Sequence, residues 1–391
     1  MSWPVDEARL ARVRALMAER DVDALVCRAP DNVVYLADYW PMKGYDHVVF
    51  PRQGETTLIA IEPQLAEATR DSWAADVRPF RFYDRSDPRP PIARSVDATV
   101  AVLGERDLTR RVGIELTQGS QGADRMVGEP TTYTASYLRA FDEVAAEVVD
   151  GCGLLAEARA TKSEQEVERI EIACELAALA LDHVAERIRP GMRESEVAAL
   201  WEGHVHEVGV GFEGRVSMAR GFSLVWSGPG IATFTATSDR PVVADAPTLF
   251  EIWVCADGYW CDLTKNICPG ELAPEYDELL DGLLAVYRRA IDHLRPGASL
   301  AELDRMIREG IAEAGYPGQP SHPVAHGVGA RAHEPPWAHQ AGGGTIEEGM
   351  VLAIEPGAYW EGGGGLRLED DFLVTPDGAR RLCRYPDDFR T

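Results

Sequence analysis

The sequence lacks several features that would assign the chain to a particular class of protein. Its seven cysteines are scattered and contain no CxxC pair, so neither a disulfide framework nor a thiolate zinc site is predicted. No apolar run approaches the length needed to span a bilayer, and charges interrupt the N-terminal stretch where a secretory signal needs an apolar core. We therefore expect a cytoplasmic protein with reduced thiols.

Runs of basic residues are also missing. The 391 residues include 39 Lys and Arg against 64 Asp and Glu, which gives a formal net charge of -25. Because this negative charge repels phosphate groups, neither nucleic acid nor a membrane is expected as a partner. The apolar share of 45% is that of an ordinary globular protein, and the length suffices for two domains.

An alternation of helix and strand patterns fills the first part of the chain. Residues 6–20 have the spacing of an amphipathic helix, and residues 24–27 form a short apolar run typical of a buried strand. Four later runs are interpreted as strands: NVVYLADY (residues 32–39), HVVFP, TTLIAIE and VGIEL. This order predicts an α/β domain over residues 1–152 and a second domain over residues 153–391.

A long helix is predicted at the start of the second domain. Ser163 and Glu166 have the spacing of a capping box, and apolar residues recur at helical spacing as far as the Pro190-Gly191 stop. An internal repeat follows, because an Arg-Pro-Gly turn occurs at residues 189–191 and again at residues 295–297.

Paired carboxylates recur at nearly the same separation as these turns. Glu251 and Asp262 lie on two strand-like runs joined by Asp257-Gly258, a strong hairpin signal. Glu355 and Glu369 occupy the matching places in the second half. Four carboxylates inside apolar runs are costly to bury unless they are paired or bind metal.

Any one of these carboxylates could also have no role in a functional site. It would then be exposed to solvent or form a salt bridge to an Arg such as Arg367. A cluster of His322, His326 and His333 favours the functional interpretation. An imidazole with several carboxylates suits Mn, Co or Fe better than a thiolate-type zinc site. Four carboxylates carry more negative charge than one divalent ion neutralises, which predicts two ions per chain (Mn, Co, Fe or Zn). A pair of ions that activates water and polarises a carbonyl oxygen suits the hydrolysis of an amide.

Several runs together resemble a known family. GYWCDLTKN, HGVGARAHEPP, AIEPG and GLRLEDDFLVT resemble the C-terminal domain shared by aminopeptidase P, prolidase, methionine aminopeptidase and creatinase. DNVVYLADYW and FPRQGETTLIAIE resemble the N-terminal domain of the creatinase and prolidase branch. The resemblance implies an α+β pita-bread domain, in which an internal pseudo-twofold explains the repeat.

The resemblance also implies roles for individual residues. The implied metal ligands are Glu251, Asp262, His326, Glu355 and Glu369. Glu355 is also implied as the general base, His322 and His333 as substrate-facing histidines, and Arg367 as an orienting residue. A homodimer and a small-molecule or short-peptide substrate are implied as well.

Two departures from the family pattern set this chain apart. Glu251 stands where metal-dependent members have an aspartate as first ligand. Because the longer side chain disturbs the ligand geometry, binding of two metals is less expected than binding of one. The family also has a histidine in the loop before that strand, where this chain offers only Phe234 or Thr235. This loss predicts an altered substrate.

Three functions remain open from the sequence. The first is a metal-dependent hydrolase of a C–N bond, similar to Xaa-Pro peptidases but with a divergent small substrate. The second is a metal-free, creatinase-like hydrolase or lyase that acts on a small nitrogenous compound, with the clustered histidines and Glu355 or Glu369 as the acid-base groups. The third is a non-catalytic binding module. Metal content separates the first two, and any turnover excludes the third.

Overall fold

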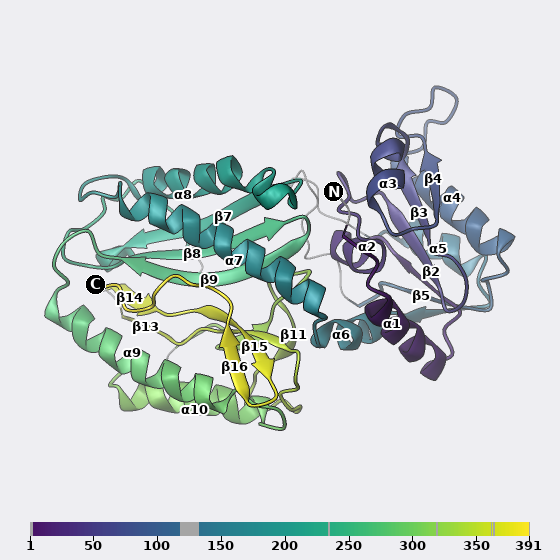
Figure 1. Ribbon diagram of the computed structural model, residues 1–391. Helices are drawn as coiled ribbons and strands as arrows, with labels where there is room; N and C mark the ends of the chain where they lie inside the picture. Colours follow the sequence, from purple (N-terminus) through teal and green to yellow (C-terminus); the bar gives the residue numbers. More distant parts are fainter. Residues whose placement is uncertain are drawn as a thin grey trace. The chain divides into compact units, whose positions relative to one another are not determined.

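The chain divides into two compact units, Met1–Arg159 and Ala160–Thr391 (Figure 1). The computed structural model describes residues 3–117, 133–233, 235–317, 320–360, 362 and 364–390. The division falls later than the boundary expected at residue 152. The reason is helix α6 (Cys152–Ala160), whose Leu154, Leu155 and Ala158 pack into the core of the first unit.

A six-stranded mixed sheet forms the first unit, in the order β4-β3-β2-β1-β5-β6. β1 is antiparallel to β2 and parallel to β5. Leu25 faces one apolar cluster and Val26 the other, so both faces of the sheet are covered, as the α/β prediction requires. The strands are β1 Ala24–Cys27, β2 His47–Pro51, β3 Thr57–Ile61, β4 Asp76–Phe80, β5 Arg111–Ile114 and β6 Glu147–Asp150. The helices are α1 Glu7–Glu19, α2 Pro30–Ala37, η1 Glu62–Gln64, α3 Leu65–Asp71, α4 Pro91–Glu105 and α5 Ala135–Asp142.

The strand predicted at residues 32–39 is wrong, because most of this stretch belongs to helix α2. Pro30 occupies its first turn, where a missing N–H costs nothing. The buried Glu115 carboxylate accepts hydrogen bonds from the backbone N–H groups of Arg28 and Ala29, at 2.9 and 3.1 Å, and so stabilises the helix N-terminus. Every residue of α2 is buried, and a fully apolar run does not distinguish a buried helix from a buried strand.

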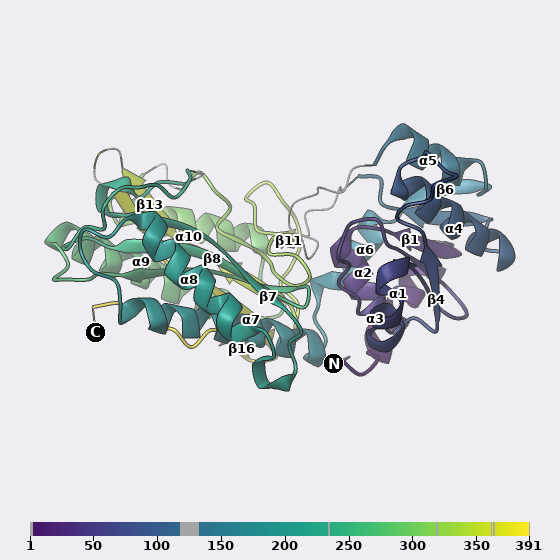
Figure 2. The same ribbon diagram turned by 90° about the horizontal axis from the view of Figure 1, so that it is seen from above.

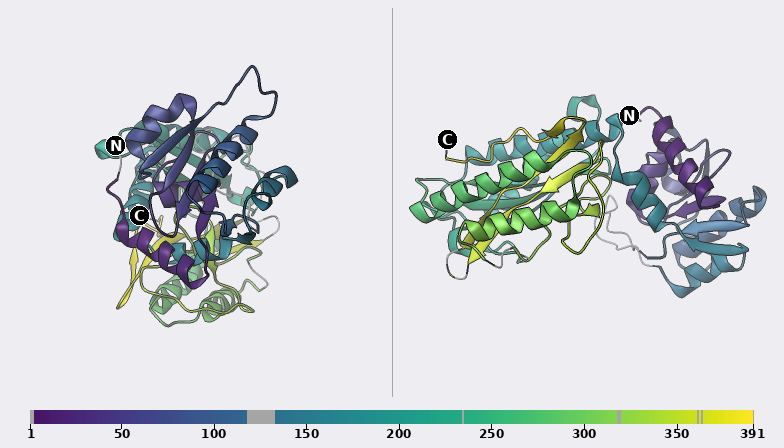
Figure 3. Two further views of the ribbon diagram at one scale, coloured as in Figure 1. Left: turned by 90° about the vertical axis from the view of Figure 1, so that its right-hand side faces the viewer. Right: turned by 90° about the horizontal axis from the view of Figure 1, so that it is seen from below.

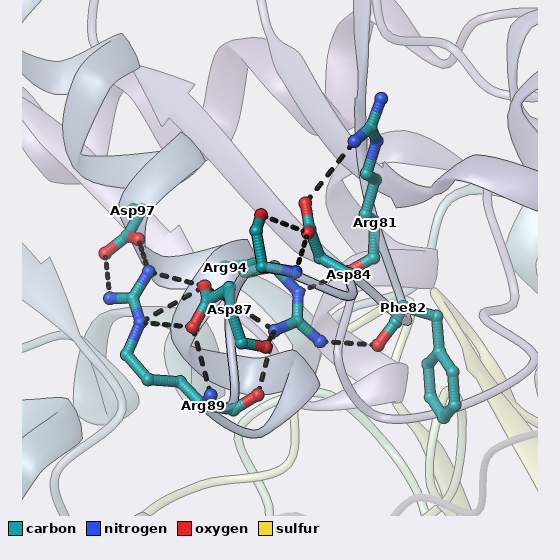
Figure 4. A network of polar contacts seen from close by, with 8 residues as sticks. Arg81, Phe82, Asp84, Asp87, Arg89, Arg94 and Asp97 are labelled. Atoms are coloured by element: carbon teal, nitrogen blue, oxygen red, sulfur yellow. Dashed lines mark hydrogen bonds and ion pairs between the residues drawn. The ribbon is translucent and has the colours of Figure 1, made fainter.

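The connection from β4 to α4 is ordered by alternating Arg and Asp side chains (Figure 4). Arg89 forms ion pairs with Asp87 and Asp97, at 2.8 and 2.6 Å. Arg94 donates to the carbonyl oxygens of Arg81 and Phe82. Water screens such exposed pairs, so the network orders the connection more than it stabilises the fold.

Two similar halves form the second unit. In the first half, α7 and α8 pack beside each other (Figure 2) and cover a three-stranded sheet in the order β7-β8-β9. In the second half, α9 and α10 pack together (Figure 3) beside a sheet in the order β11-β10-β12-β15-β16 and a hairpin of β13 and β14. This is the internal repeat predicted from the sequence.

The elements of the first half are α7 Glu164–Ala185, α8 Glu194–Gly209, η2 Phe212–Gly214, β7 Ala219–Ser227, η3 Gly228–Gly230, β8 Thr248–Ala256 and β9 Tyr259–Ile267. Those of the second half are α9 Pro274–His293, α10 Leu300–Glu313, β10 Ala325–Gly327, β11 Glu334–Trp337, β12 Val351–Ile354, β13 Gly357–Trp360, β14 Gly364–Arg367, β15 Asp370–Thr375 and β16 Gly378–Arg381. The capping box predicted from Ser163 and Glu166 is present at the start of α7.

The two halves meet through backbone hydrogen bonds between Thr264 and Glu369. The Thr264 N–H lies 3.4 Å from the Glu369 carbonyl oxygen, and the Glu369 N–H lies 3.3 Å from that of Thr264. This bridge places the strand that carries Asp262 beside the one that follows Glu369. Among the helices that the structure describes, none has the length and apolar character needed to cross a bilayer.

Candidate metal centre

A tight turn between β8 and β9 sets the geometry of the first two carboxylates. Ala256 pairs with Tyr259, so Asp257 and Gly258 alone form the turn. Both have positive φ, 44° and 91°, as a type I′ turn requires. The Asp257 carboxylate also accepts the backbone N–H of Ser217 at 2.8 Å, which fixes the start of the sheet.

The register of this hairpin brings four side chains to one face. Glu251 lies opposite Thr264, and Trp253 lies opposite Asp262. Residues two apart on a strand share a face, so Glu251 and Asp262 are diagonal neighbours on it. The sequence predicted that the hairpin would bring these two carboxylates together, and the backbone register of the two strands agrees with that prediction.

The second half contributes an imidazole and two more carboxylates. His326 lies in β10 and pairs with Ala353 of β12. Glu355 directly follows β12, and Glu369 directly precedes β15. Because β12 pairs with both β10 and β15, these three side chains are held at adjacent strand ends.

The side chains of the two halves converge around His326. Its Nε2 lies 3.6 Å from Asp262 Oδ2 and 3.5 Å from Glu355 Oε1. Ligand atoms of His326, Glu355 and Glu369 lie within 4.8 Å of one another, and so do those of Asp262, His326 and His333. Both groups contain His326, which marks a single centre.

Two buried atoms at this centre lack hydrogen-bond partners. Asp262 Oδ2 and His326 Nε2 have none, although each residue is only 1% exposed. His326 Nδ1 lies 3.0 Å from the carbonyl oxygen of Gly327; a hydrogen on Nδ1 would leave a lone pair on Nε2. Asp262 Oδ2 and His326 Nε2 would then face each other as two electron-pair donors. Such a pair fits a divalent cation bound between them.

The protonation behaviour of these groups reflects their crowding. Burial raises the pKa of Asp262 far above its usual range, and the neighbouring Glu369 adds to the shift. Burial, followed by repulsion from Glu355, raises the pKa of Glu369 to about 8. Burial also acts on Glu355, but the neighbouring imidazoles of His322 and His326 outweigh it and lower the Glu355 pKa. Carboxylates in this state need a counter-charge to remain ionised together.

A family comparison decides where the chain belongs. Residues 168–376, more than half of the chain, match metallopeptidase family M24, and residues 9–161 match the creatinase/prolidase N-terminal domain. The chain belongs to the M24 family. This confirms the resemblance, the pita-bread fold and the assignment as a hydrolase.

Two curated relatives match nearly the whole chain. A Xaa-Pro dipeptidase of Pyrococcus furiosus is 28% identical over 379 residues, 96% of this chain and 97% of the relative. A putative dipeptidase of Bacillus subtilis, YkvY, is 31% identical over 390 residues, 97% of this chain and 98% of the relative.

Solved structures agree with this assignment. The prolidase from Pyrococcus furiosus superposes with a TM-score of 0.76 at 27% identity, over 95% of this chain and 99% of that one. The prolidase from Pyrococcus horikoshii shares the fold, with a TM-score of 0.79 at 24% identity over 98% of this chain and 100% of that one.

Glu251, which the family resemblance led us to expect as the first ligand, belongs to neither group of possible ligands. Its Oε2 lies 2.8 Å from Arg367 Nη2. Arg367 Nε also donates to the Thr264 hydroxyl at 2.7 Å and lies 3.6 Å from Glu369 Oε2. The salt bridge that the sequence offered as an alternative for a carboxylate is therefore present at Glu251.

The two outer histidines differ in their surroundings. His322 is buried, with Nδ1 3.0 Å from Glu355 Oε2 and Nε2 3.1 Å from the Tyr359 hydroxyl. His333 has a side chain 45% exposed, and its Nε2 lies 3.3 Å from Asp262 Oδ2. Burial and then the charge of His326 lower the pKa of His333 to about 4. His333 therefore remains neutral near pH 7.

Sequence reasoning missed three residues that support the centre. The Thr264 hydroxyl donates to Glu369 Oε2 at 2.6 Å. The Tyr359 hydroxyl contacts both His322 and Arg367. The carboxylate of Asp371, which is fully buried, accepts the Asp262 N–H at 3.1 Å. The sequence held one pattern that could have identified any of these three residues: alternation along the strand puts Thr264 on the same face as Asp262.

The loop in which the family resemblance led us to expect a histidine leads from β7 to β8. Of the two residues considered for its place, Phe234 lies outside the described residues and Thr235 is exposed. The neighbouring Thr233 hydroxyl lies 3.5 Å from that of Ser321, one residue before His322.

Proposed function

We propose that the chain is a metal-dependent hydrolase that cleaves the C–N bond of a small, peptide-like substrate. One observation carries the proposal: the buried atoms Asp262 Oδ2 and His326 Nε2 lack hydrogen-bond partners beside Glu355 and Glu369. An isolated buried carboxylate is costly, and a cation bound among these four residues removes that cost.

In this proposal Asp262, His326, Glu355 and Glu369 hold the divalent ion. When bound, such an ion lowers the pKa of water and polarises a carbonyl oxygen. Glu355 accepts the proton of the attacking water, because the contact of its Oε2 with His322 Nδ1 at 3.0 Å orients the carboxylate.

The outer residues position the substrate. His333, half-exposed and neutral, hydrogen-bonds the scissile amide from the side of Asp262, and His322 does so from the side of Glu355. Arg367 orients Glu369 through Thr264.

The substrate in this proposal differs from that of the Xaa-Pro dipeptidases. The support is the loop before β8, which has no histidine. A panel of Xaa-Pro dipeptides, other dipeptides, N-acyl amino acids and small cyclic amides tests it. We expect kcat/KM to be higher for a compound outside the Xaa-Pro group than for any Xaa-Pro dipeptide. Preferred hydrolysis of an Xaa-Pro dipeptide would contradict the proposal of a different substrate.

One observation favours a second candidate, a metal-free hydrolase or lyase. Arg367 already neutralises Glu251, so this carboxylate needs no metal. Turnover that survives exhaustive chelation would establish this candidate in place of the first.

The homodimer implied by the family resemblance remains a prediction. Light scattering of the purified protein checks it, with a mass of twice 42.9 kDa as the expected result.

A further inference from the structure

We propose that this chain binds a single divalent cation, because Arg367 holds Glu251, the carboxylate that a second cation would need, out of the ligand set. The inference rests on the proposed metal-dependent function. It concerns how Glu251 and Arg367 act toward the metal, where the family resemblance implied two ions.

The donor atoms describe one centre. Within the part of the chain that the structure describes, two groups of residues have the spacing for a cation, and both include His326. Glu251 belongs to neither group. A second ion would need Glu251 as a ligand, because the remaining carboxylates, Asp262, Glu355 and Glu369, already surround His326.

Arg367 pairs with the carboxylate that a second cation would need. Its Nη2 lies 2.8 Å from Glu251 Oε2, and its Nε lies 3.6 Å from Glu369 Oε2. The guanidinium therefore bridges two carboxylates from the two halves of the domain. It is only 3% exposed and always charged. The ion pair with Arg367 keeps the Glu251 carboxylate out of both groups of possible ligands.

The length of the Glu251 side chain explains the arrangement. Glu251 projects from β8 on the same face as Asp262, and its carboxylate extends one methylene farther than an aspartate would. The extra length carries the carboxylate to the guanidinium. Metal–ligand distances tolerate only a few tenths of an ångström, so a carboxylate held by Arg367 is lost to the ligand set.

Trp253 further restricts the space beside Asp262. It lies directly opposite Asp262 in the β8–β9 register, and its ring centroid is 6.2 Å from that of His333. A bulky indole at this place leaves less room for an ion on this side of Asp262, whose Oδ2 already lies 3.3 Å from His333 Nε2.

The test is a count of bound metal. Metal-free protein is titrated with Mn²⁺ by isothermal titration calorimetry, and the loaded protein is examined by electron paramagnetic resonance. We expect one equivalent and the spectrum of an isolated Mn²⁺ ion. Two equivalents with an exchange-coupled spectrum would overturn the inference while leaving the metal-dependent function intact. No binding at all would overturn both.

Two variants of Glu251 sharpen the count. Glu251→Gln keeps the length but removes the charge, and should still bind one equivalent, since Glu251 is not a ligand. Glu251→Asp withdraws the carboxylate from Arg367 and should gain a second, weaker equivalent. Loss of the single site in Glu251→Gln, with circular dichroism unchanged, would show that Glu251 is a ligand and would contradict the proposal. So would an unchanged single equivalent in Glu251→Asp.

Discussion

A single hydroxyl, that of Tyr359, connects both sides of the candidate centre. It lies 3.1 Å from His322 Nε2 and 3.3 Å from Arg367 Nη1. Through these contacts it joins a residue beside Glu355 to the residue that holds Glu251. The centre is therefore one connected network of side chains.

Removing this hydroxyl should weaken catalysis without unfolding the protein. A neutral hydrogen bond contributes about 1 kcal/mol, so we expect Tyr359→Phe to lower kcat about fivefold while the melting temperature changes little. Tyr316→Phe, which removes a hydroxyl three residues after the end of α10, is the matched control. Equal effects of the two substitutions on kcat would contradict the role assigned to Tyr359.

A buried histidine makes the first unit sensitive to acid. Burial, followed by the charge of Arg28, lowers the pKa of His47 from 6.5 to about 3. Its Nδ1 lies 2.8 Å from the Ser95 hydroxyl. Between these two pKa values the unfolded chain binds the proton and the folded chain does not, so folding stability falls as the pH drops below 6.5.

His47→Gln removes this dependence. Each pKa unit corresponds to about 1.4 kcal/mol, so a few kcal/mol of acid sensitivity should disappear between pH 6.5 and pH 3. Urea unfolding at a series of pH values measures it, with His339→Gln at an exposed position as the control. An unchanged pH slope in His47→Gln would refute the assignment.

At the scale of elements, the β8–β9 hairpin fixes the register of the metal face. Gly258 has φ 91° in its turn, which a residue with a Cβ adopts only at a cost of about 1–3 kcal/mol. We expect Gly258→Ala to lower the free energy of unfolding by about that amount and to weaken metal binding. Gly203→Ala is the control, since this helical glycine in α8 has open space around it and alanine there should stabilise by about 0.5–1 kcal/mol. Thermal unfolding of both variants checks the prediction, and destabilisation by Gly203→Ala would contradict it.

Sequence patterns predicted some elements and missed others for physical reasons. The hairpin and the capped start of α7 were predictable because Asp-Gly turns and Ser-x-x-Glu boxes act locally. Helix α2 was not, because its complete burial hides the helical period. Its N-terminus also depends on Glu115, which lies far away in the sequence.

The same distinction holds within the candidate site. Buried carboxylates and clustered histidines stand out against apolar runs, so the donors at Asp262, His326, Glu355 and Glu369 could be proposed from the sequence. The partner of Glu251 could not be chosen, because the ion pair with Arg367 requires strands from both halves to meet. Asp371 acts through a backbone N–H, which no side-chain pattern reports.

At the scale of the whole molecule, the four proposed ligands lie in Ala160–Thr391, and none lies in Met1–Arg159. Metal binding stabilises the folded form that holds the ligands, by about 2.7 kcal/mol when the free ion is at one hundred times its Kd. We therefore expect Mn²⁺ to slow amide hydrogen exchange in β9, β10, β12 and β15.

The strands β1 to β3 of the first unit serve as the internal reference for this exchange experiment. Their exchange rates should change far less, and the Asp262→Ala protein should show no added protection. Equal slowing in both units would contradict a site confined to the second unit.

The measurement that tests the account most directly is metal content together with hydrolysis, compared among the natural protein, Asp262→Ala, His326→Ala and the control His339→Ala. The account predicts bound Mn, Fe, Co or Zn and C–N hydrolysis in the natural protein and in His339→Ala. Both should be lost in Asp262→Ala and His326→Ala. Hydrolysis by natural protein that contains no metal and is insensitive to chelation would contradict it.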